Sequence, residues 1–230
     1  MKIGILECGH TEGEIAEKHG TLPTLFANLL DGHGFTFENW DVENRVFPPD
    51  EFAADGWLVT GSVHGVYEDH AFIPELEIFV RQAYSASVPT VGICFGHQLI
   101  AQALGGRVEK FQGGWTIGHQ VYDFEEHGEL GLNAWHQDQV IERPADSRVI
   151  ASNDFCTNAA LLYGNRALTI QAHPELGGPI IAAYLKMCRG TRDYDDGIMD
   201  RAEENLTRPD ASAFIGDQIA SFFKAAHLAL

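Results

Sequence analysis

Cys94 is the residue whose surroundings are most typical of a reactive thiol. It follows a short apolar run over residues 90–93, and a glycine lies two positions away on each side, at Gly92 and Gly96. The residues after Cys94 are apolar at helical spacing until Gly105-Gly106, which predicts a helix that begins beside the thiol. A strand, a sharp turn and a helix with a nucleophile at the turn form a nucleophile elbow. The glycines leave room for that strained turn, and the helix N-terminus favours the thiolate.

The same stretch offers a donor for a charged intermediate. The backbone N–H of Phe95, directly after the thiol, can point at an oxyanion that develops on a substrate carbonyl. The alternative is that Cys94 is an inert side chain in a core strand, which is the usual state of a free cysteine. The elbow spacing of the two glycines favours the nucleophile.

A thiol nucleophile needs a base and usually a group that orients the base. Among eleven histidines, His173 stands out because it directly follows an apolar strand predicted over residues 167–172, so it could share a sheet edge with Cys94. Glu175 is two residues further on, and in an extended segment this spacing places both side chains on one side. Pro174 restricts the backbone between them. The alternative is a turn histidine beside a surface glutamate.

The GxCxGxQ pattern over residues 92–98 and the HPE pattern over residues 173–175 together resemble the class I glutamine amidotransferase family. The resemblance extends from Lys2 to about Leu185 and implies a catalytic triad of Cys94, His173 and Glu175. Cys94 would attack the side-chain amide of glutamine, or a related γ-glutamyl carbonyl, and form a thioester. His173 would protonate the leaving amine and then activate water.

The resemblance also implies an oxyanion hole made by the N–H of Phe95 and an N–H of the Gly61-Ser62 loop. The family usually has Gly-Gly-Pro at this loop, whereas this chain has Gly61-Ser62-Val63. This departure bears on the second donor of the oxyanion hole, because the direction of that N–H depends on the backbone conformation of the loop.

Three further residues are expected to line the substrate site because of the resemblance. Gln98 matches a family glutamine beside the substrate, and the HQDQV segment over residues 136–140 resembles the family's HxDxV, which makes His136 and Gln137 candidates. Taken without the resemblance, Gln98 is a helix-surface amide and His136 is a packing residue.

The elements around these motifs alternate between strand and helix. Strands are expected at residues 2–6, 35–42, 57–60 and 90–93, and helices at residues 22–30, 74–85 and 178–188. Alternation of this kind predicts an α/β fold with a doubly wound, mostly parallel sheet, in which ligands bind beyond the carboxyl ends of the strands. The resemblance implies a flavodoxin-like architecture.

The segment over residues 107–124 is glycine-rich and alternating, which indicates a small antiparallel β addition. Further short strands are expected at residues 140–141 and 148–151. The sequence predicts a loop over residues 8–21. It predicts a loop with a short surface helix over residues 193–205 and a terminal amphipathic helix over residues 211–226. We expect one domain over residues 1–230.

Composition excludes several classes of function. The 230 residues carry 15 Lys and Arg against 33 Asp and Glu, a net charge of −18, which disfavours binding to nucleic acid or to an anionic membrane. Four cysteines without a CxxC pair indicate neither a zinc site nor a disulfide framework. The absence of a signal-like or membrane-spanning run makes a cytoplasmic location the default. His64, Glu68, Asp69 and His70 could be drawn as a metal cluster, but we interpret them as surface residues and expect no metal or cofactor.

Four functions are consistent with some of these features. The first is a glutaminase that delivers ammonia to a separate synthetase subunit. The second is a stand-alone γ-glutamyl peptidase or hydrolase, since several segments resemble the GMP-synthase-like branch that includes such peptidases. The third is a redox or chaperone protein of the DJ-1/PfpI kind, which Gln98 and the HPE motif disfavour. The fourth is a silent binding domain, which an intact triad disfavours.

Overall fold

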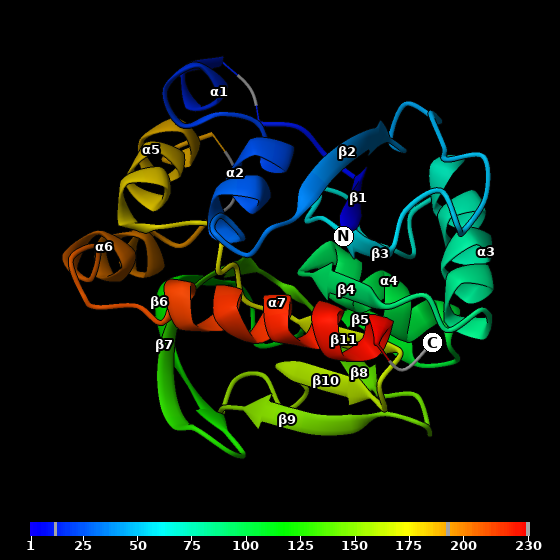
Figure 1. Cartoon of the computed structure of the whole chain (residues 1–230). Helices are drawn as coiled ribbons and strands as arrows, with labels where there is room; N and C mark the ends of the chain where they lie inside the picture. Colours follow the sequence, from blue (N-terminus) through cyan, green and yellow to red (C-terminus); the bar gives the residue numbers. More distant parts are fainter. Residues whose placement is uncertain (12, 192–193, 229–230) are drawn as a thin grey trace.

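The computed structural model describes residues 1–11, 13–191 and 194–228 (Figure 1). A nine-stranded sheet with the order β2-β1-β3-β4-β11-β10-β9-β6-β7 forms its centre, and β5 and β8 pair as a separate two-stranded ribbon. The strands are β1 (Lys2–Glu7), β2 (Thr36–Asp41), β3 (Gly56–Val59), β4 (Thr90–Ile93), β5 (Arg107–Lys110), β6 (Thr116–Phe124), β7 (Gly128–His136), β8 (Asp138–Glu142), β9 (Arg148–Ser152), β10 (Ala160–Tyr163) and β11 (Ala167–Ile170). The helices are α1 (Gly13–His19), α2 (Leu22–Leu29), α3 (Phe72–Ser85), α4 (Phe95–Ala103), α5 (Gly178–Cys188), α6 (Asp196–Glu204) and α7 (Ser212–His227).

The predicted α/β fold class is confirmed. Strands β2, β1, β3, β4 and β11 pair in parallel, and the antiparallel strands β10, β9, β6 and β7 continue the same sheet. Every residue of β3, β4 and β11 is buried, which is the pattern of parallel strands covered on both faces.

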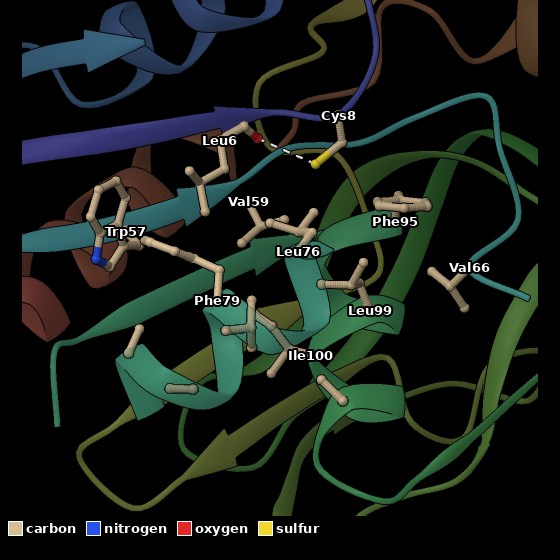
Figure 2. Close-up of a cluster of buried hydrophobic side chains, with 14 of the residues drawn as sticks. Leu6, Cys8, Trp57, Val59, Val66, Leu76, Phe79, Phe95, Leu99 and Ile100 are labelled. Carbon is tan, nitrogen blue, oxygen red and sulfur yellow. Dashed lines mark hydrogen bonds between the residues drawn. The ribbon is translucent and has the colours of Figure 1, made fainter. Parts of the chain in front are cut away.

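Alternate residues of the parallel strands enter two different cores, because successive side chains in a strand point to opposite faces. Leu6, Trp57 and Val59 pack against α3 and α4, and Figure 2 shows this cluster, in which the rings of Trp57 and Phe79 meet edge to face with centroids 4.8 Å apart. The residues between them enter the core under α2 and α7, together with Phe223.

Most element boundaries predicted from periodicity agree with the structure, and the exceptions have physical reasons. The segment expected to be a loop over residues 8–21 contains α1, whose buried contact is Ile15 alone, too weak a stripe to signal a helix. Strands β7 and β10 were not predicted, since β7 is partly exposed at the sheet edge and β10 has four residues. Asp193, where a loop was expected to begin, lies outside the described residues.

The carboxyl ends of the five parallel strands meet at one edge of the sheet. The chain leaves β1 for β2 on one side and later returns to β3 on the other, so β1 and β3 flank a topological switch point. Ligands of doubly wound sheets bind at such a point. None of the helices among the described residues is long and apolar enough to cross a membrane.

Candidate active site

Cys94 sits at the tip of a strained turn between β4 and α4. Its φ of 52° and ψ of −103° lie outside the regions that residues other than glycine favour. A Cβ atom on Gly92 would lie 2.5 Å from the carbonyl oxygen of Gly96, and a Cβ atom on Gly96 would lie 2.3 Å from the carbonyl oxygen of Val59. Both positions therefore require glycine, because neighbouring backbone lies too close to admit a Cβ atom. This agrees with the predicted nucleophile elbow.

His173 and Glu175 lie beside this thiol, although they are almost eighty residues away in sequence. The His173 Nδ1 atom is 2.6 Å from Glu175 Oε1, and the Glu175 side chain is fully buried. The ring of His173 also interacts with the Cys94 thiol. Burial disfavours the imidazolium, but the charges of Glu175 and Cys94 outweigh it and hold the pKa of His173 well above its usual value. The environment thus favours a protonated His173 ring beside the Cys94 thiol.

The backbone that brings His173 and Glu175 together differs from the extended segment we expected. His173 makes an isolated bridge with Asn133 of β7, and Pro174 and Glu175 then form a turn that the Leu176 N–H closes by donating to the His173 carbonyl at 3.3 Å. Proline favours the second position of such a turn because its φ is already set.

Asn133 fixes both ends of this turn. Its carbonyl accepts the His173 N–H at 2.8 Å, and its side-chain amide donates to the Leu176 carbonyl at 2.7 Å. No signal in the sequence singled out Asn133, because the strand that carries it was not predicted.

The loop after β3 packs directly on the two catalytic candidates. A Cβ atom on Gly61 would lie 3.1 Å from His173 Cε1 and 3.8 Å from Cys94 Cβ. The preceding residue, Thr60, accepts the Gly96 N–H with its carbonyl at 3.1 Å. The Gly61-Ser62 loop is therefore held against the elbow.

Gln98 is buried, contrary to the alternative of a helix-surface amide. Its Nε2 donates to the Asp138 carbonyl at 2.9 Å and to Gln171 Oε1 at 3.0 Å. His136 Nδ1 lies 3.2 Å from the same Asp138 carbonyl. Gln98 and His136 therefore converge on the start of β8, and Gln171 is a member of this network that sequence reasoning missed.

His136 and Gln137 both line the cavity. Burial, with a smaller contribution from His173, lowers the pKa of His136 to about 3, so the ring is neutral. Its Nε2 is buried and has no hydrogen-bond partner among the described residues, which leaves one polar atom free for a ligand. Gln137 donates to the Phe111 carbonyl at 3.3 Å.

One cavity of about 270 Å³ is bordered by Cys94, His173, Gly61, Gln98, His136 and Gln137, whereas Glu175, Asn133 and Gln171 lie behind its lining. Beside these polar groups, the lining includes an aromatic wall formed by Trp115, Trp135, Tyr184 and Tyr194. The wall is packed internally: Tyr194 lies edge to face with Trp115 at 4.9 Å and with Trp135 at 5.8 Å between ring centroids.

The remaining candidates lie outside the elbow. Cys8 is buried, donates its thiol to the Leu6 carbonyl at 3.4 Å (Figure 2), and has a pKa raised by burial, so its environment disfavours a thiolate. Of the four residues considered as a metal cluster, the structure gathers His64, Glu68 and His70 but not Asp69, and His64 and Glu68 also line the cavity. All four cysteines are buried.

Comparisons with known proteins show which family and which solved structures this chain is similar to. A family model described as glutamine amidotransferase class-I matches residues 33–180. Gamma-glutamyl peptidase 2 of Arabidopsis thaliana is 25% identical over 207 residues, which span 84% of both chains. One of the subunits of the glutamine-hydrolysing GMP synthase of Halobacterium salinarum is 29% identical and covers 76% of this chain and 97% of its own.

A solved structure shares the fold over the whole length. The glutamine amido transferase from Methylobacillus flagellatus superposes with a TM-score of 0.76 at 19% identity and covers 100% of this chain and 94% of its own. At that identity the likeness concerns the fold alone.

Proposed function

The chain belongs to the class I glutamine amidotransferase family, and from this membership we propose that it hydrolyses a γ-glutamyl amide bond through a thioester on Cys94. The observation that carries the proposal is the contact of the Cys94 thiol with His173, whose ring is held by the buried Glu175. A nucleophile, a base and an orienting carboxylate at hydrogen-bonding distance are the parts that acyl transfer requires.

The reaction proceeds in two steps, which are acylation of Cys94 and hydrolysis of the resulting thioester. The Cys94 thiolate adds to the γ-carbonyl carbon and forms a tetrahedral oxyanion. Its collapse breaks the C–N bond, and the proton on His173 passes to the departing amine. His173 then takes a proton from water, the resulting hydroxide attacks the thioester, and glutamate leaves as the thiol is restored. The high pKa of His173 suits the first step, because the imidazolium is the acid that the leaving amine needs.

The oxyanion is held by the Phe95 N–H and by an N–H of the Gly61-Ser62 loop. The first belongs to α4, whose leading N–H groups have no partner within the helix. The second is supported by the contact of Gly61 with His173 and Cys94. Each such donor typically contributes about 2.7–4 kcal/mol to the transition state.

The γ-glutamyl part of the substrate binds on the polar side of the cavity. Gln98 orders the start of β8, and the free Nε2 of His136 and the amide of Gln137 contact the substrate's polar groups. If the leaving group is ammonia, the reaction is the glutaminase half-reaction of an amidotransferase. A separate synthetase would then consume the ammonia, and the likeness to a GMP synthase subunit supports this possibility.

A second candidate, a stand-alone γ-glutamyl peptidase, is favoured by the aromatic wall. Ammonia is small and polar and gains nothing from four aromatic side chains, whereas an organic leaving group would bury apolar surface against them. The γ-glutamyl peptidases among the relatives point the same way.

The isolated protein should be assayed with glutamine, γ-glutamyl peptides and γ-glutamyl amines, with Cys94→Ala as the matched control. We expect amine release from at least one compound and none from the variant. Peptide cleavage without a partner selects the stand-alone peptidase, and turnover only with an added synthetase selects the glutaminase. Turnover that persists in Cys94→Ala contradicts the mechanism.

A further inference from the structure

We propose that His64, Glu68 and His70 form a binding site for a divalent transition metal of the zinc class at the rim of the cavity. These residues belong to the segment between β3 and α3 and have no part in the thioester mechanism. One ligand atom from each can be chosen so that all three lie within 4.8 Å of one another. Two imidazoles and a carboxylate are a donor set that zinc uses.

The spacing of the donors is close to what a tetrahedral ion needs. Zinc bonds of about 2.0–2.2 Å at tetrahedral angles put ligand atoms about 3.4 Å apart. Glu68 Oε2 lies 3.0 Å from His70 Nε2 and 3.8 Å from His64 Nδ1, which brackets that value. The two imidazole rings stand 4.0 Å apart between centroids. Small side-chain rotations suffice to place all three atoms around one ion.

An outer carboxylate orients one of the rings. His64 Nε2 lies 2.8 Å from Glu43 Oε1, which leaves Nδ1 facing Glu68. A ligating histidine commonly donates its second ring N–H to a carboxylate, which sets the tautomer and raises the basicity of the coordinating nitrogen. Glu43 comes from the segment after β2, so the arrangement is built from two parts of the chain.

Aromatic packing holds the two rings before any ion arrives. Phe72, the first residue of α3, lies 5.9 Å from His64 and 6.1 Å from His70 between ring centroids. Phe72 also lies 6.0 Å from Phe95, the residue after Cys94. The site is therefore supported by the same core that supports the elbow.

The site is open to incoming ions. The side chains of Glu68 and His70 are 45% and 38% exposed, and the net charge of −18 attracts divalent cations to the surface. A bound ion links the two ends of the segment over residues 64–70, and this segment is tied to Ser62, whose Oγ accepts the His64 N–H at 3.2 Å.

Zinc affinity should be measured by equilibrium dialysis in a Cys94→Ala background, because the thiol is itself a zinc ligand, and the geometry by Co²⁺ absorption. We expect one ion per chain with tetrahedral bands, binding on the order of 100-fold weaker in His70→Ala, and binding about 10–100-fold weaker in Glu43→Gln.

Asp69→Asn is the matched control, since Asp69 is exposed, adjacent in sequence and outside the cluster. It should leave the zinc affinity unchanged. Circular dichroism and thermal unfolding without metal verify that each variant is folded. The proposal is overturned by a lack of saturable binding, by equal affinity in His70→Ala, or by an equal loss in Asp69→Asn, which would indicate diffuse attraction to acidic residues.

Discussion

The Nδ1 atom of His173 lies 2.6 Å from Oε1 of Glu175, in a place where the carboxylate has no access to solvent. The other oxygen, Oε2, has no hydrogen-bond partner among the described residues. The pair therefore sets the orientation of His173 and leaves the second ring nitrogen for the thiol.

Replacing Glu175 with Gln should lower kcat by about 10²–10⁴, because the amide can accept a hydrogen bond but cannot stabilise the imidazolium. The pKa of His173, which Glu175 raises, should fall, so the limb of the pH–rate profile assigned to it should move to lower pH. Steady-state rates between pH 5 and 10 test both effects. An unchanged kcat and profile would remove Glu175 from the mechanism.

A glutamine-like diazo-ketone should attach once, at Cys94, since Cys8 and Cys156 are buried thiols whose pKa values burial raises. Peptide mass spectrometry locates the adduct. Cys94→Ala should prevent labelling and change the free energy of unfolding by less than about 1.5 kcal/mol. Labelling at Cys8 would exclude the assignment.

Gly61→Ala should impair turnover more than folding. Its new methyl group would lie 3.1 Å from His173 Cε1, so the ring must shift, and a displacement of about 1 Å at a reacting group can cost about 10²-fold in rate. Gly177→Ala is the control, because its methyl group would approach only Pro179, at 3.9 Å. Equal rates for Gly61→Ala and the unmodified chain would show that the loop does not constrain His173.

Gln98→Met should raise KM about tenfold with a smaller change in kcat, since it removes the donors that order the start of β8 but no reacting group. Gln102→Met, about one turn further along α4, removes comparable bonds to Val66 and Glu77 outside the cavity. Initial-rate measurements should show a normal KM for that control. A kcat loss without a KM change at Gln98 would assign it to the chemical step.

His97 should make the protein sensitive to acid. Burial lowers its pKa to about 3, so the unfolded chain takes up a proton below about pH 6.5 that the folded chain does not. The stability that this neutral histidine contributes is full above pH 6.5 and decreases as pH falls towards 3.

In His97→Gln, the pH dependence of the free energy of unfolding should be shallower by about 1.4 kcal/mol per pH unit in that window. Urea unfolding between pH 4 and 7 measures the difference. Parallel curves for the two proteins would mean that His97 is protonated in the folded state.

The sequence by itself determined the elements whose signals are local. Residues 90–93 and 178–188 were predicted with the bounds that the structure has, because β-branched runs, glycine turns and helical spacing act over a few residues. The same is true of Gly92 and Gly96, whose spacing around Cys94 already required small side chains.

Only the tertiary structure decided which distant residues meet. Asn133, Gln171 and Gly61 contact the site through strand order and register, and no short pattern encodes those. The turn at Glu175 and the exclusion of Asp69 from the His64 cluster were settled the same way. A local pattern restricts φ, ψ and burial, whereas contacts between residues 40–80 positions apart depend on how the strands between them pair.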